Sequence, residues 1–149
     1  MCGGDEPKMV SKNTLSTDAW DEIYTYLQTT NAISTNNIFG AWNSTLSNDK
    51  GYPLVIINHP LVSMNKLSVT GSFIQSEISI TIDIYHTNHE AVKTLKDEVV
   101  QKLLAGRKAF AGNGFKRMMM SDGEFDTWAE GKKKIHVLSF DLTFFYAEA

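Results

Sequence analysis

Two histidines near the middle of the chain have the spacing of a small metal site. His86 and His89 stand three positions apart, where an alternating strand runs into an amphipathic helix. A zinc ion needs at least three protein ligands, often histidines with a carboxylate, and the adjacent Glu90 points elsewhere on a helix. No further ligand follows at a suitable spacing. We therefore expect His86 to end the strand, His89 to lie in the first helical turn, and the chain to bind no metal and no other cofactor.

Two carboxylates could carry acid–base chemistry if the fold brought them together. Asp83 and Asp141 lie on the polar faces of two strongly alternating strands. One carboxyl group acting as acid and another as base is a common catalytic arrangement. Like charges directly opposite each other destabilise a sheet, so we expect the two carboxylates to be offset on a solvated or subunit-facing surface.

The remaining reactive residues lack the context that catalysis requires. Ser63 has no nucleophile-elbow sequence around it, and Cys2 lies on a polar arm at the start of the chain. The segment Gly112-Asn113-Gly114 lacks the Gly-x-Gly-x-x-Gly pattern and does not open a helix, so it is not expected to bind phosphate. The sequence therefore predicts no catalytic residue and a protein that is not an enzyme.

Contacts with other molecules are predicted instead in a polar segment near the end of the chain, Ser121–Lys134. This segment is either a loop or the two strand ends of a hairpin carried beyond the sheet. Aromatic residues on a polar segment are typical of interfaces, where Trp and Tyr contribute much of the binding energy. The alternative is a solvated hairpin tip, because acidic residues lie in the same segment as the lysines. The candidate contact residues are Phe125, Trp128, Lys132, Lys133 and Lys134.

Two further candidates come from strands that carry apolar side chains on both faces. Successive side chains of a strand point to opposite faces, so the run Met118–Met120 cannot face one core throughout. By the same rule Phe145 opposes Phe144. We expect Met119 and Phe145 to point outward, against a neighbouring subunit or under the N-terminal helix.

The elements that position these residues form one domain, residues 16–149, behind a polar arm at residues 1–15. Ser16 or Thr17 is expected to cap the first helix, and Thr87 or Asn88 the second. The periodicity predicts helices at 16–30 and 90–105, strands at 36–43, 54–58, 66–70, 78–85, 115–120 and 135–146, and a flexible link at 109–114. This order predicts an α/β (α+β) fold in which two main helices flank a mostly antiparallel mixed sheet with a long β-hairpin near the C-terminus.

The composition narrows the classes of function. The 149 residues carry a net charge of −3, so no global basic field exists to hold nucleic-acid phosphates. RNA binding by an open sheet would call for an aromatic motif that the sequence lacks. A single cysteine excludes a disulfide within the chain, and no apolar run approaches the length of a membrane span. We expect a cytoplasmic site of synthesis and no membrane partner.

The order of the elements and their local residue composition resemble those of a known protein family. An N-terminal helix precedes a strand of the form PLVIIN (Pro53–Asn58), and a strand enters a helix through YHTNHEAVKTLKDEVVQKLLAG (Tyr85–Gly106). The terminal strand reads KIHVLSFDLTFFYAEA. Over residues 16–147 the chain resembles the tail-terminator proteins of long-tailed bacteriophages, also described as tail-completion or head-to-tail joining minor tail proteins.

The resemblance implies a structural virion protein at the tail end or neck, assembled in the host cytoplasm. Members form a hexameric ring that caps the tail tube, stops its polymerisation and offers a docking surface to the neck. The implied partners are further copies of the chain, the tail-tube protein and the neck or connector protein of the capsid, while DNA passes through the lumen without specific binding. The hairpin segment Ser121–Lys134 is the implied tube- or neck-facing loop. The alternatives are another head–tail connector or neck completion protein, and a small metal- or ligand-binding α/β domain.

Overall fold

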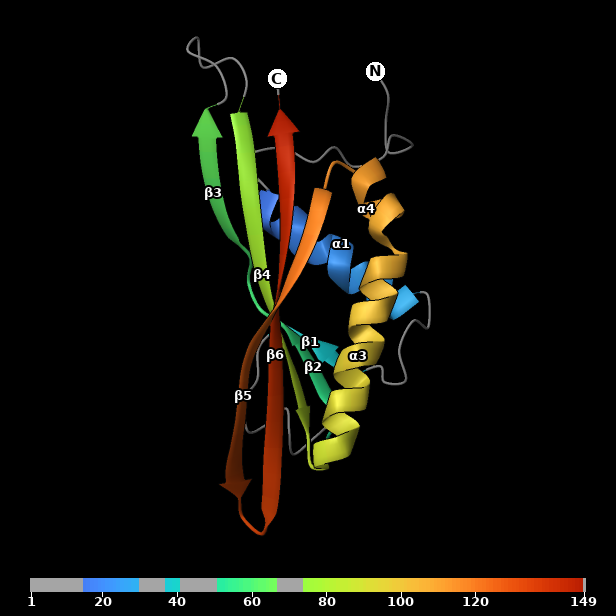
Figure 1. Ribbon diagram of the computed structural model, residues 1–149, viewed down its shortest axis with the longest axis vertical. Helices are drawn as coiled ribbons and strands as arrows, with labels where there is room; N and C mark the ends of the chain where they lie inside the picture. The colour runs from blue at the N-terminus through green and yellow to red at the C-terminus, as the bar shows by residue number, and fades with distance from the viewer. Residues whose placement is uncertain (1–14, 30–36, 41–50, 67–73, 149) are drawn as a thin grey trace.

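The fold is built from one sheet and a layer of helices (Figure 1). The computed structural model describes residues 15–29, 37–40, 51–66 and 74–148. The predicted N-terminal arm therefore lies, apart from Leu15, outside the described residues. In chain order the elements are α1 (Leu15–Thr29), β1 (Ile38–Phe39), β2 (Leu54–Ile57), β3 (Leu61–Lys66), β4 (Ile74–His86), α3 (His89–Ala105), α4 (Arg107–Gly112), β5 (Lys116–Glu130) and β6 (Lys133–Glu148).

The sheet has six strands in the order β1-β2-β4-β6-β5, with β3 paired to β4 beside β2. Among the described strands, only the short β1–β2 pair is parallel, and the other pairs are antiparallel. Strand β4 pairs with β6 along its whole length, from Ile74↔Glu148 to His86↔His136. The predicted α+β fold with a mostly antiparallel mixed sheet, two main helices and a C-terminal hairpin is confirmed.

One face of this sheet forms the core. The isoleucines at alternate positions of β4, from Ile78 to Ile84, are fully buried, because residues i and i+2 of a strand share a face. They cluster with Phe140, Leu142 and Phe144 of β6 and with apolar side chains of α1, α3 and α4. The isoleucine face therefore packs against the helices.

Helix α3 matches its predicted amphipathic pattern. Val92, Leu95, Val99 and Leu103 are its buried residues, and their 3.6-residue spacing places them in one stripe. At the start, the Asn88 side chain accepts a hydrogen bond of 2.9 Å from the Ala91 N–H, which satisfies one of the unpaired donors of the first turn. Asn88, one of the two predicted caps, is thus the cap.

The strand expected at 66–70 overlaps β3 (Leu61–Lys66) at Lys66, and its other residues lie outside the described residues. Two other predictions about local structure were wrong. The link expected at 109–114 contains the short helix α4, whose Phe110 is buried in the core and thus anchors it. The first helix begins at Leu15, so Ser16 and Thr17 lie within its first turn rather than before it. Leu15 is buried in the core, and its burial explains why the helix starts before Ser16. The polar residues that precede Leu15 in the sequence gave no indication of this burial.

The segment Ser121–Lys134 is a hairpin and not a loop. Strands β5 and β6 continue pairing as far as Glu130↔Lys133, and Gly131 turns the chain with a positive φ of 62°. Glycine adopts this conformation without a steric penalty. Because β4 ends at the His86↔His136 pair, the hairpin tip extends beyond the neighbouring strand.

Candidate interaction surfaces

The second face of the sheet, opposite the helices, is the larger candidate surface around β3 and the strands beside it, whereas Ile56 and Ile135 on the same face are buried near β2 and the hairpin base. Cross-strand pairs place Leu61, Ser79, Thr143 and Met119 in one row across β3, β4, β6 and β5. Leu61 is 74% exposed and Met119 is 54% exposed. Because α1, α3 and α4 pack on the isoleucine face, no helix among the described residues covers this row. We call this side the open face.

The two outward-pointing candidates lie on the open face. Phe145 pairs with Glu77 and with Lys116 and is half-buried, whereas Phe144 is in the core. Met119 is exposed, and its neighbours Met118 and Met120 pack against the core. The alternative that the N-terminal helix covers these side chains is wrong, because Ile23 and Leu27 of α1 join the core cluster on the opposite side.

Asp83 and Asp141 are on adjacent strands of the open face but are not paired with each other. Asp83 pairs with Ser139, and Asp141 pairs with Thr81. Asp83 accepts hydrogen bonds from Ser139 Oγ and, at 2.9 Å, from Asn58 Nδ2. Asp141 Oδ1 accepts one of 2.7 Å from Thr81 Oγ1. The predicted offset is confirmed: each carboxylate faces a hydroxyl group, which avoids direct repulsion.

The hairpin tip is the second candidate surface. Lys132, Lys133 and Lys134 are all exposed there. Trp128 pairs with the fully buried Ile135, and its ring meets Tyr85 edge-on at a centroid distance of 5.7 Å. Trp128 therefore supports the base of the tip from within the chain, which leaves the lysines as the outermost groups.

Tyr85 has an unusual environment beneath this tip. Burial raises the pKa of its hydroxyl to about 12, and the nearby Asp83 and Tyr52 contribute in the same direction. Each of these effects disfavours a phenolate, which would be a poorly solvated anion close to another negative charge. Tyr85 thus stays neutral at physiological pH and acts as a packing residue.

Two histidines, His89 and His136, lie close together on the other side of the hairpin base. The His89 and His136 ring centroids are 5.3 Å apart, and Phe125 lies 5.4 Å from His89. Thr127 Oγ1 is 3.1 Å from Nδ1 of His136. Phe125 is 49% exposed, so it remains available for outside contacts. The sequence reasoning missed His136, whose distance from His86 in sequence hides their pairing across β4 and β6.

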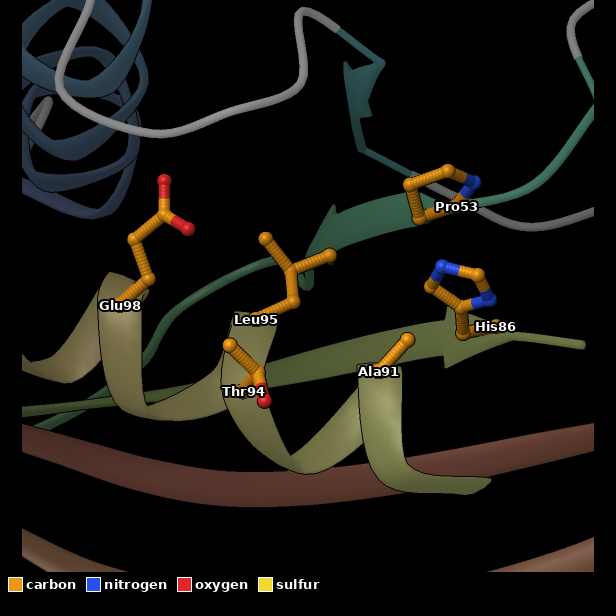
Figure 2. A pocket seen from close by; sticks show the side chains of 6 residues that line it. All are labelled: Pro53, His86, Ala91, Thr94, Leu95 and Glu98. Atoms are coloured by element: carbon orange, nitrogen blue, oxygen red, sulfur yellow. The ribbon is translucent and has the colours of Figure 1, made fainter. Parts of the chain in front are cut away.

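The surroundings of His86 favour the neutral form of its side chain. Its Nδ1 accepts a hydrogen bond of 3.1 Å from the Asn88 N–H. Burial lowers the pKa of His86, and the nearby His136 lowers it further. His86 lines a pocket of about 290 Å³ together with Pro53 and residues of α3. Figure 2 shows these side chains. Within the described residues, no group of three or more His, Cys, Asp or Glu side chains is placed to hold a metal ion.

A charged link ties the hairpin to the helix layer. Lys96 Nζ of α3 lies 2.6 Å from Asp122 Oδ1 of β5. Hydrogen bonding from Lys96 and its positive charge lower the pKa of Asp122. The segment Gly112-Asn113-Gly114, predicted not to bind phosphate, lies at the end of α4, whose last residue is Gly112. There the Asn113 side chain donates a hydrogen bond of 2.6 Å to Glu22 of α1.

No family model matches the chain, and no curated protein matches it. A search of the helices in the described parts of the chain finds none with the length and apolar character of a membrane span.

Proposed function

We propose that this protein is a structural subunit of a long-tailed phage virion, a ring-forming terminator that caps the tail tube. The ring stops tube polymerisation and presents a docking surface to the neck or connector of the capsid. The family resemblance motivates the proposal, and the α+β architecture agrees with the fold that the resemblance implies.

The observation that carries the proposal is the open face. Large exposed apolar side chains are unfavourable in water unless a partner covers them. Among the described residues, Leu61 and Met119 are the two largest exposures of this kind, and both lie in the same row of the open face. A subunit that assembles into a ring buries such a face when its neighbour arrives.

The hairpin supplies a surface of different character. Its exposed lysines extend beyond β4. A ring with cyclic symmetry needs two different patches on every subunit, because one subunit's head meets the next one's tail. The open face and the hairpin tip are two such patches.

The direct test is tube elongation in vitro with the tail-tube protein encoded in the same genome. Pre-formed short tubes are incubated with the purified chain before fresh tube protein is added, and tube lengths are measured by electron microscopy. We expect a ring at one tube end and little further growth. Tubes that lengthen as fast with the protein as without it, and carry no ring, would rule out a terminator.

The second candidate is another connector or completion protein of the same neck. The same open face would serve such a protein, but its target would differ. A connector is expected to bind the portal or neck complex and leave tube elongation unchanged. Pull-down of the capsid neck complex in parallel with the elongation assay therefore separates the two functions.

A further inference from the structure

The charges of the two candidate surfaces are complementary. Where β4 and β6 pair with each other, their open-face positions carry the carboxylates of Glu77, Asp83 and Asp141 and no lysine or arginine. The hairpin tip carries three consecutive exposed lysines, 132–134. Opposed patches of this kind attract each other and fix the orientation of partners.

The tip cannot reach the open face of its own chain. Lys133 and Thr143 both lie on β6, ten positions apart. At about 3.3 Å per residue, this separation is roughly 33 Å along a nearly straight strand. Contact between the two surfaces therefore requires two copies of the chain.

The size of the open face suits a hairpin. Leu61 and Met119 stand at the two ends of a four-strand row, which spans three strand spacings or roughly 14 Å. A two-stranded ribbon with its side chains is about 10 Å wide. The aliphatic stems of lysines can cover apolar side chains while their charged ends remain hydrated or paired.

We propose that the tip of the β5–β6 hairpin of one copy docks on the open face of a second copy. In this arrangement Lys132–Lys134 approach the carboxylates of the two central strands, and the lysine stems lie between Leu61 and Met119. The contact joins two different surfaces, so it propagates head to tail and closes into a ring when the rotation permits. The inference rests on the proposed function, whose ring it supplies with a subunit contact.

Two variants, each lacking one surface, test the inference. The tip variant carries Lys132→Glu, Lys133→Glu and Lys134→Glu, and the face variant carries Leu61→Asp and Met119→Asp. All five side chains are described as exposed, so both variants are expected to fold, which circular dichroism and thermal melting verify. Each variant alone should associate at least roughly a hundredfold more weakly than wild type, because every head-to-tail contact then includes one damaged surface.

The mixture of the two variants is the decisive sample. The intact tip of the face variant fits the intact face of the tip variant, so a 1:1 complex should form. It should stop at two subunits, because only damaged surfaces remain. Sedimentation velocity or light scattering measures the mass. A mixture that stays monomeric overturns the inference, as does a tip variant that associates with itself as wild type does.

A matched control separates this contact from general charge effects. Changing Lys102, Arg107 and Lys108 to Glu alters the net charge by the same amount on exposed positions of α3 and α4, and it should leave association unchanged. A wild-type chain that is monomeric at every concentration also overturns the inference. Normal assembly through tip and face without tube capping would instead reject the terminator function and leave the subunit contact standing.

Discussion

Gly106 joins α3 to α4, and an added methyl group at this position would meet two aromatic rings. A Cβ built there lies 2.7 Å from Cζ and 2.9 Å from Cε1 of Tyr26, and 3.1 Å from Cζ of Phe110. The backbone of Gly106, with φ −83° and ψ 0°, suits alanine. The substitution Gly106→Ala therefore tests packing alone, without backbone strain.

The expected loss follows from the ways in which Tyr26 can respond. If its ring stays in place, overpacking costs about 1–3 kcal/mol. If the ring swings away, it gives up the hydrogen bond of 2.8 Å from its hydroxyl to the Lys102 carbonyl, worth about 0.5–1.5 kcal/mol. It also loses its edge-on contact with Phe110 at 5.1 Å, worth about 0.5–1.5 kcal/mol. Both responses predict a loss of about 1–3 kcal/mol.

Thermal and urea unfolding measure this loss. For a domain of this size, the expected fall in Tm is roughly 3–10 °C. Gly112→Ala is the matched control, since its Cβ meets nothing within 4 Å and the change should stay within about 0.5 kcal/mol. In a Tyr26→Ala background, Gly106→Ala should cost much less, as a double-mutant cycle would show. An equal cost in both backgrounds would refute the steric explanation.

Two predictions concern titration. The folded-state pKa of His86 is lowered. The contribution of His86 to folding stability is therefore present above about pH 6.5 and is lost as the pH falls through the folded pKa. The substitution His136→Gln should raise the pKa of His86 in an NMR titration, and an unchanged pKa would remove His136 as a cause. The pKa of Asp122 is lowered by Lys96, so Lys96→Met should raise the pKa of Asp122 towards its usual value. Carboxyl-carbon NMR can measure this change. An unaltered titration curve would show that the ion pair between Lys96 and Asp122 does not persist in solution.

The two carboxylates show what an alternating sequence pattern can predict and what it cannot. Period-two patterns predicted that Asp83 and Asp141 lie on the polar faces of two strands, because side-chain direction is a local property of a strand. The pairing of Thr81 with Asp141 and of Ser139 with Asp83 depends on register. Register is set by the contact of distant segments, and no local pattern at either strand specifies it.

The hairpin shows the same difference between what the sequence predicts and what the contact of distant segments decides. Its lysines and aromatics were identified from composition, but its continuous pairing was only one of two alternatives. The turn at Gly131 and the pairing up to Glu130↔Lys133 decided in favour of strands. The partner of Trp128 was also concealed, because Tyr85 is distant in sequence and meets the indole only when β4, β6 and β5 lie side by side.

The spacing of apolar residues by itself determined the strand–helix–strand half of this protein, because helical and strand periodicity are local. It also determined that at least one of Met118–Met120 points away from the core and that Phe145 opposes Phe144. Only the tertiary structure decided that α1 packs on the same side as α3 and that Leu61 lies in one row with Met119. The choice of the side that a helix covers arises from burial between distant segments, and it is this choice that leaves the opposite face open.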